Sequence, residues 1–326
     1  MGTFSRRLLG ISPRETTFAR RGFRCDSAAV RERLEQVGRC FLAGYLRGLE
    51  TPRCDALAVR LEAEVERDFR GFAYEGAAMA YALLDILTPW RRHRLRDLLE
   101  GPGDAHVYVV HVGAGWALAR LPVRVDPALA RLHPVFRWLA LDGFGFHQGY
   151  FHWPEAVVRQ RVPRRVRGYA RRAFDQGLGR SLWFVEGADP GRIAAAIAAF
   201  PTDRHGDLWS GVGLACCYAG GVDRGAVEEL SRAAGDFRPH LGQGAAFAAK
   251  ARLRAGIVTA DSALACAVLC GGATVEAAAA ATDEALLAMQ AGFRPAAAGL
   301  PDFEHWRRAI QQRIAPAPAA DVAAAS

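Results

Sequence analysis

The stretch Asp142-Gly-Phe-Gly-Phe-His-Gln-Gly-Tyr-Phe-His-Trp153 combines three glycines, two histidines, an acid and several aromatic rings within twelve positions. Weaker versions of its layout recur on both sides. In each, an aspartate stands seven to nine residues ahead of a glycine that opens a segment rich in small residues. Recurrence at such a spacing is typical of helical repeats, in which each unit needs its neighbours to bury its apolar face.

Seven segments align on a glycine, with successive separations of 38, 37, 36, 28, 34 and 33 residues. An aspartate ahead of a segment can cap the first backbone amides of a helix. A glycine inside a helix is tolerated where a neighbouring helix crosses closely. The aligned glycines are Gly38, Gly76, Gly113, Gly149, Gly177, Gly211 and Gly244, and the aspartates are Asp68, Asp104, Asp142, Asp203 and Asp236.

Between the glycine segments, prolines mark a second set of helix starts at Thr88-Pro89, Asp126-Pro127, Trp153-Pro154 and Asp189-Pro190. Proline suits the first helical turn, where its missing N–H is not needed. The sequence therefore predicts an all-α protein, a tetratricopeptide-like α-solenoid of about seven helical hairpins over residues 25–314. An N-terminal arm (1–24) would precede it and a disordered Pro/Ala tail (315–326) would follow.

Two features compete with this prediction. The stretch His106-Val-Tyr-Val-Val-His-Val112 is rich in β-branched residues and could form a strand. Pro134 and Pro163 fall inside proposed second helices, which they should kink or split.

The composition limits the function classes. Of 42 basic residues only Lys250 is a lysine, so the net charge of +8 reflects an arginine bias and permits an acidic partner without selecting one. Seven cysteines without paired spacing predict reduced thiols and no metal site. The glycine pairs do not complete a dinucleotide or Walker loop, so no cofactor is predicted. With no long apolar run and no nucleic-acid module, we expect a cytoplasmic protein without membrane insertion or nucleic-acid binding.

Four residues are candidates for proton-transfer chemistry: Glu75, Asp142, His147 and His152. Glu75 stands in an otherwise apolar segment, where burial would raise the pKa of its carboxyl group. The two histidines lie about 140° apart around a helix, because each residue turns the chain by roughly 100°, so they do not form a local metal pair. The alternative is that Asp142 is a helix cap and the histidines are satisfied polar groups.

The residues just before the aligned glycines are often polar, and equivalent positions of stacked repeats face the same side. They could form a polar ladder in a groove that also carries aromatic rings, which would suit a long, flat, unsaturated ligand. Hydrogen bonds between neighbouring helices are an equally good explanation. The groove candidates are Tyr74, Phe146, Gln148, Tyr150, Trp209 and Gln243.

Arginines are dense near residues 159–172. Arg164, Arg165 and Arg167 could form a docking face for an acidic carrier protein or another anionic partner. A solvated helix face in an arginine-rich chain is the simpler interpretation.

Several blocks of the chain also resemble the accessory proteins encoded beside enediyne polyketide synthases in actinobacteria. The blocks are RRLLGISPRETTFARRGF (6–23), YEGAAMAYALLDIL (74–87), HVGAGWALARL (111–121), DGFGFHQGYFH (142–152), GRSLWFVEGADPGRI (179–193), DLWSGVGLACCYAGG (207–221) and QGAAFAAKARLRAG (243–256). The resemblance implies a role in converting a linear polyene from an iterative synthase into an enediyne core. It carries over no catalytic residue.

Two hypotheses follow. The first is an accessory enzyme, or an essential component of one, whose groove holds a polyene or polyketide intermediate while Glu75, Asp142 and His147 assist proton movements. Because alkyne formation is oxidative and no cofactor motif is present, such a protein would need a partner that removes electrons. The second is a non-catalytic helical-repeat scaffold or chaperone for the synthase or for other proteins of the same gene cassette.

Overall fold

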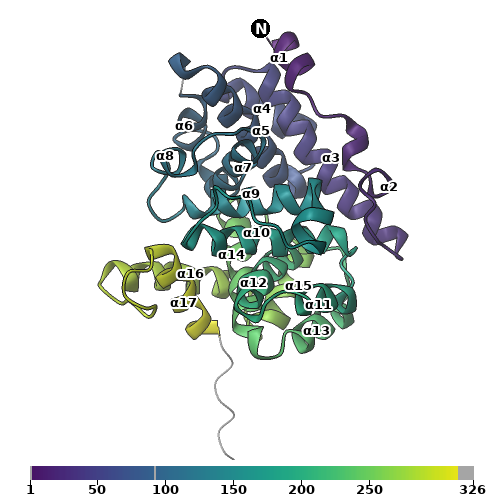
Figure 1. The fold of residues 1–326 in the computed structure, drawn as a ribbon, viewed down its shortest axis with the longest axis vertical. Coiled ribbons are helices and arrows are strands. Elements are labelled where there is room, and N and C mark those ends of the chain that lie inside the picture. Colours follow the sequence, from purple (N-terminus) through teal and green to yellow (C-terminus); the bar gives the residue numbers. More distant parts are fainter. Residues whose placement is uncertain (1, 92, 315–326) are drawn as a thin grey trace, which may run out of the picture.

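The computed structural model describes residues 2–91 and 93–314, and all regular structure in those ranges is helical (Figure 1). The all-α prediction is therefore confirmed. The longest helices form a row in which each packs against the next. In chain order they are α3 (Ala28–Glu50), α5 (Arg70–Leu87), α7 (Val107–Arg120), α9 (Trp138–Phe151), α10 (Tyr169–Val185), α12 (Thr202–Ala219), α14 (Arg238–Arg254) and α16 (Val275–Gln290).

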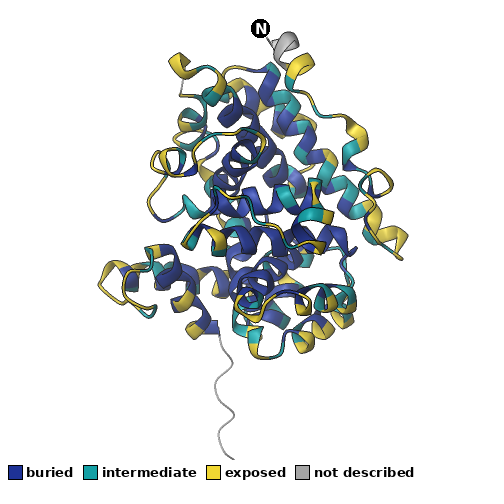
Figure 2. Ribbon diagram, in the orientation of Figure 1, coloured by how far each residue is buried: buried dark blue, intermediate teal, exposed yellow. Residues whose placement is uncertain are grey.

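Shorter helices and helical turns connect the members of this row and lie outside it. They are α4 (Cys54–Glu64), α6 (Arg94–Leu99), α8 (Val125–Leu129), η5 (Pro154–Val158), α11 (Pro190–Ala198), α13 (Arg224–Ala233) and α15 (Ala260–Leu269). The last helix, α17 (Asp302–Ile314), follows the row and packs against α14 and α16. Burial follows the same division, since buried residues concentrate along the row and exposed residues on the connecting elements (Figure 2).

The glycine pairs explain how closely the helices of the row approach one another. A Cβ atom added at Gly113 of α7 would lie 2.2 Å from the carbonyl oxygen of Glu75 on α5, and one at Gly115 would lie 1.8 Å from that of Ala140 on α9. Each pair thus serves two crossings, one with the preceding helix and one with the following helix. The pairs Gly143/Gly145, Gly177/Gly179 and Gly211/Gly213 repeat this arrangement on α9, α10 and α12.

The row is curled, so that helices far apart in sequence meet. Arg252 of α14 is 1% exposed, and it donates hydrogen bonds to the backbone carbonyls of Asp68 and Tyr218. Its guanidinium lies over the ring of Tyr218, with 4.2 Å between the guanidinium carbon and the ring centroid. Phe72 of α5 meets the same ring edge-on at 4.9 Å between centroids. One buried arginine thus joins α14 to both α12 and the start of α5.

Several local predictions are corrected. The proposed aspartate caps are wrong, because Asp142 lies in the middle of α9 and no side chain caps α5, α7, α9, α12 or α14. The competing possibility of a strand at 106–112 is excluded, because Val107–Val112 form the first part of helix α7, where Val109, Val110 and Val112 are buried. The helices predicted at Asp126-Pro127 and Trp153-Pro154 are the short α8 and η5, and both end before Pro134 and Pro163, which lie in non-helical segments. At Asp189-Pro190 the predicted start is confirmed, and Asp189 accepts a hydrogen bond from the backbone N–H of Arg192 at 2.7 Å.

The N-terminal arm is part of the folded body. It consists of α1 (Gly2–Leu9), the turn η1 (Pro13–Thr16) and α2 (Phe18–Arg21), and it packs along α3 (Figure 1). Thr16, Phe18 and Phe23 are buried. The Pro/Ala tail at 315–326 lies outside the described residues. Within residues 2–91 and 93–314, no helix is long and apolar enough to cross a membrane.

Candidate functional site

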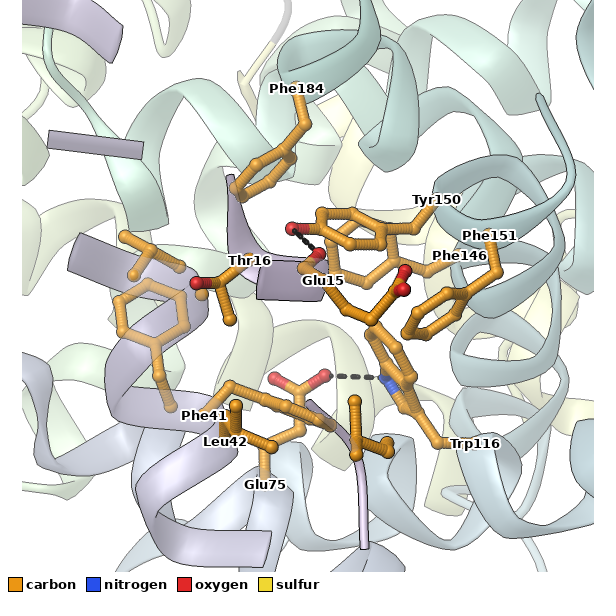
Figure 3. A pocket seen from close by; sticks show the side chains of 14 residues that line it. Glu15, Thr16, Phe41, Leu42, Glu75, Trp116, Phe146, Tyr150, Phe151 and Phe184 are labelled. Carbon is orange, nitrogen blue, oxygen red and sulfur yellow. Dashed lines mark hydrogen bonds between the residues drawn. The ribbon is translucent and has the colours of Figure 1, made fainter. Parts of the chain in front are cut away.

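An apolar pocket lies between the N-terminal arm and helices α3, α5, α7, α9 and α10 (Figure 3). It is narrow and holds about 490 Å³ of space between atoms, its open mouth included. Aromatic rings form much of its wall, and a single fully buried carboxyl group faces it. The lining residues are Ile11, Glu15, Thr16, Val37, Gly38, Phe41, Leu42, Phe72, Glu75, Trp116, Phe146, Tyr150, Phe151 and Phe184.

The buried carboxyl group belongs to Glu75, which lies in an apolar run of α5 and is 1% exposed. Trp116 Nε1 donates a hydrogen bond to Glu75 Oε1 at 2.9 Å, as Figure 3 shows, and Arg180 Nη2 lies 3.8 Å from Glu75 Oε2. Burial raises the pKa of Glu75 to about 7, although Arg180 and the Trp116 hydrogen bond act in the opposite direction. The carboxyl group can therefore give up or accept a proton near neutral pH.

This pKa leads to a stability prediction for Glu75→Gln. The carboxyl ionises near pH 4.5 in the unfolded chain and near pH 7 in the folded one, so the native state loses stability as pH rises through this window. A shift of this size corresponds to about 3 kcal/mol. Urea unfolding at pH 5, 6, 7 and 8 should show the variant gaining on the parent protein by up to this amount. A difference that does not change with pH would mean that Glu75 is ionised throughout.

The aromatic wall presents flat surfaces at several angles. The ring of Phe41 lies 4.4 Å from that of Trp116 between centroids, tilted by 37°, and Phe146 meets Trp116 edge-on at 5.1 Å. Phe184 extends the wall at 5.4 Å from Phe146. Such surfaces favour a flat, conjugated or aromatic ligand over a bulky saturated one.

The N-terminal arm covers one side of the pocket. Arg21 pairs with Glu15 at 2.6 Å and donates to the backbone carbonyls of Tyr150 and Phe151, at 3.1 and 2.5 Å, at the end of α9. Gly38, one of the aligned glycines, faces the arm, since a Cβ atom there would lie 3.2 Å from that of Thr16, with the hydroxyl of Tyr150 on α9 at 3.4 Å. The arm therefore completes the pocket.

Behind Glu75 a chain of buried polar groups crosses the row of helices. Arg180 of α10 donates to Asp142 of α9, and Gln176 donates to the other oxygen of the same carboxylate at 2.8 Å. Ser210 of α12 lies 3.2 Å from Gln176 Oε1 and 2.9 Å from Gln243 Oε1, within hydrogen-bond distance of both. The polar ladder thus exists, but for Gln176, Ser210 and Gln243 it consists of hydrogen bonds between neighbouring helices in the core.

One known protein family matches nearly the whole chain. A family model described as "Protein of unknown function (DUF1702)" matches residues 1–314. The chain belongs to the DUF1702 family. No curated protein and no solved structure matches it. The matched range includes every residue that lines the pocket, so the whole pocket lies within the DUF1702 region.

The two histidines do not belong to this DUF1702 pocket in the way the sequence suggested. His147 is buried beside Trp116, with 5.5 Å between ring centroids, and burial lowers its pKa to about 3, which keeps it neutral. His152 is exposed at the end of α9, 6.0 Å from His147 between centroids. Gln148 lies 3.4 Å from His147 through its amide nitrogen and does not line the pocket, and it makes no hydrogen bond to the ladder residues. Neither the His147 ring nor the His152 ring lines the pocket. Within the described part of the chain, no group of three or more His, Cys, Asp or Glu side chains could hold a metal ion.

Of the predicted groove residues, only Phe146 and Tyr150 line the pocket with Glu75. Tyr74 stacks on His106 at 4.2 Å between ring centroids, and its hydroxyl donates to Glu62 at 3.4 Å. Trp209 is buried in α12 and is not part of the pocket lining. Neither residue lines this pocket: Tyr74 is held by His106 and Glu62, and Trp209 lies on α12, which contributes no lining residue.

The predicted docking arginines separate into two kinds. Arg164 and Arg167 are exposed, as a docking face requires. Arg165 is half-buried over the ring of Phe144 and donates to the carbonyls of residues 119, 121 and 123 at the end of α7. Its inclusion in the docking face is wrong, because it holds that helix end.

Sequence reasoning missed three contributors to the pocket. Arg180 and Trp116 hold the Glu75 carboxylate, and Glu15 brings the arm over the pocket. Arg180 could have been found by the criterion that singled out Glu75, because it is a charged residue three positions after an aligned glycine in a segment of mostly apolar residues. Nothing in the arm's own sequence pointed to the pocket.

Proposed function

We propose that this protein binds a flat, conjugated, mostly apolar molecule in the pocket around Glu75 and acts on it as an accessory protein of enediyne biosynthesis. In this proposal the ligand is the linear polyene derived from a polyketide synthase, and the protein acts in the cytoplasm. The observation that carries the proposal is one fully buried carboxyl group, with a pKa of about 7, facing an aromatic pocket. The resemblance of the sequence blocks supplies the pathway.

In this proposal Glu75 moves a proton to or from the ligand, and Trp116 and Arg180 fix the carboxylate in place. A group that titrates near the working pH is the most effective general acid or base. Asp142 holds Arg180 rather than the ligand, and so acts as a positioning residue. The electrons of an oxidative step would pass to a partner protein, which Arg164 and Arg167 could bind. The row of central helices would serve as a tetratricopeptide-like α-solenoid that presents both surfaces.

The test uses Glu75→Gln in a producing strain from which the gene has been deleted. We expect the variant to restore less than about a hundredth of the product formed with the parent gene, because general acid–base catalysis contributes roughly 10²- to 10⁴-fold. Glu186→Gln is a matched control, since Glu186 is also 1% exposed but lies outside the pocket and pairs with Arg24. Metabolite titre and the identity of any accumulated intermediate are measured.

A second readout separates binding from chemistry. Purified Glu75→Gln protein should still bind diphenylhexatriene, a neutral linear polyene, as tightly as the parent protein in a fluorescence titration. Normal titres from the variant would rule out proton transfer by Glu75 and favour the scaffold hypothesis. Failure of the parent protein to bind the probe would rule out the pocket as a polyene site.

A further inference from the structure

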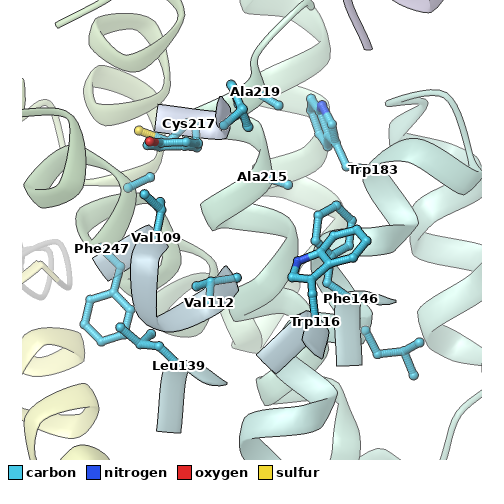
Figure 4. Close-up of a cluster of buried hydrophobic side chains, with 14 of the residues drawn as sticks. Val109, Val112, Trp116, Leu139, Phe146, Trp183, Ala215, Cys217, Ala219 and Phe247 are labelled. Carbon is cyan, nitrogen blue, oxygen red and sulfur yellow. The ribbon is translucent and has the colours of Figure 1, made fainter. Parts of the chain in front are cut away.

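A second apolar cavity lies on the other side of Arg180. It holds about 460 Å³ of space between atoms, its open mouth included, and is bounded by α7, α9, α10, α12, α14 and α17. Its lining residues are Tyr108, Val109, Val112, Leu139, Arg180, Leu214, Tyr218, Phe247, Ala248, Lys250, Ala251 and Trp306. Figure 4 shows Val109, Val112, Leu139 and Phe247 close together in the core, on the opposite side of the view from Trp116 and Phe146 of the first pocket.

The cavity contains the single lysine of a chain with 42 basic residues. Lys250 extends from α14, and its side chain is 16% exposed, whereas that of Arg180 is 5% exposed. The two cations therefore mark an outer and an inner part of an otherwise apolar space. A lysine differs from an arginine in being a compact charge on a flexible stem, which can follow a ligand group rather than fix it in a plane.

Only weak interactions within the protein hold the ammonium group of Lys250. Among the described residues its hydrogen-bond partner is Asp283 of α16, at 2.5 Å, and the Asp283 side chain is 50% exposed. Water solvates the half-exposed Asp283 carboxylate and competes with Lys250 for it, so this pair is weaker than one in which both partners are buried. A carboxylate that enters the cavity from a ligand would meet the same ammonium in a less polar setting, where the attraction is stronger. A ligand could thus replace Asp283 at small cost.

We propose that this cavity is a binding site for a fatty-acid-like amphiphile, with its chain among Val112, Leu139 and Phe247 and its carboxylate on Lys250. The site is separate from the pocket around Glu75 and does not depend on the function proposed for it. A monoanion fits better than a phosphate, because only one mobile cation is present and Arg180 is already shared between Asp142 and Glu75.

The test is calorimetric titration of the purified full-length protein with dodecanoate and with dodecanol, its uncharged analogue. We expect dodecanoate to bind at least about tenfold more tightly than dodecanol, since a hydrogen bond to a charged group contributes about 1.5–3 kcal/mol. Lys250→Met should remove that preference while keeping the apolar stem. Asp283→Asn should tighten dodecanoate binding, because it frees the ammonium.

The opposite signs for the two variants distinguish a ligand contact from a structural role. Glu75→Gln should leave dodecanoate binding unchanged, which separates this site from the first pocket. Equal affinity of the parent protein for acid and alcohol, or unchanged binding in Lys250→Met, would overturn the proposal. So would weaker binding in Asp283→Asn.

Chemical modification of Lys250 gives a second test, which does not rely on the heat of binding. An amine-selective reagent can modify only Lys250 and the α-amino group in this chain, so peptide mass spectrometry reports the lysine directly. Dodecanoate should slow modification of Lys250 severalfold relative to the α-amino group, and dodecanol should not. Equal modification rates with and without dodecanoate would contradict a contact between the carboxylate and the lysine.

Discussion

Gly177→Ala is expected to destabilise the protein by more than about 3 kcal/mol, among the largest effects of any single methyl group in the chain. The added Cβ atom would lie 1.7 Å from the backbone carbonyl oxygen of Asp142. No side-chain rotation can relieve this clash, because the obstacle is the backbone of α9. Helices α9 and α10 would have to separate, which would also disturb the contact between Asp142 and Arg180. Urea unfolding followed by circular dichroism measures the change.

Gly191→Ala is the matched control for this prediction. Gly191 lies in the short outer helix α11, and the nearest atom to its added Cβ would be 3.5 Å away. Alanine is favoured over glycine in a helix by up to about 1 kcal/mol, so this variant should be neutral or slightly more stable than the parent protein. If the two variants unfold at the same urea concentration, the close approach of α9 and α10 is wrong.

Arg180→Met should cost about 3–5 kcal/mol, the range found when one partner of a buried ion pair is removed. The substitution leaves Asp142, which is 0% exposed, without its cation, and it also removes the positive charge that stabilises ionised Glu75. The pKa of Glu75 should therefore rise further, because Arg180 is the largest influence that lowers it. Unfolding free energies measured at pH 6 and pH 8 report both effects.

Two comparisons make the Arg180 result specific. Arg308→Met removes an exposed arginine, 44% accessible, that pairs with Glu304 at 2.9 Å, and it should cost no more than about 1 kcal/mol. In the double variant Arg180→Met with Asp142→Asn the buried charge is absent, so the loss should be clearly smaller than the sum of the two single losses. Additive losses would show that the two side chains do not interact.

The helical class and the helices of the row could be predicted because the glycine spacing records a real constraint. At Gly76, Gly113, Gly177, Gly211 and Gly244 the side chain is missing for the reason expected, close approach to a neighbouring helix. The prediction failed where one signal has several causes. Asp142 precedes an aligned glycine as a cap would, yet it is a mid-helix partner of Arg180. The spacing of residues along the chain does not show whether an acidic side chain accepts a hydrogen bond from a backbone amide at a helix start or pairs with a cation far away in the sequence.

The pocket was harder to predict than the fold. Glu75 was found because a charge in an apolar run demands an explanation, and its raised pKa follows from the same fact. Two residues that line the pocket with it come from 60 or more positions away, Glu15 in the arm on one side and Phe146 on α9 on the other. Such contacts depend on how the row curls, which no local pattern encodes. The two histidines were misleading because they are close in sequence to residues of the pocket wall, although their own side chains do not line the pocket.

The contact made by Arg252 has a consequence for how the chain reaches its native state. In an open array each unit touches only its neighbours, so parts of it can melt separately and folding can start anywhere. Here a residue of α14 is bonded to the carbonyl of Asp68, 184 positions earlier in the sequence. Closing so long a loop delays assembly, and two distant parts of the row, α14 and the segment just before α5, then support each other. We therefore expect the row to begin to unfold and fold as one cooperative unit only late in folding, when α14 docks against the segment before α5.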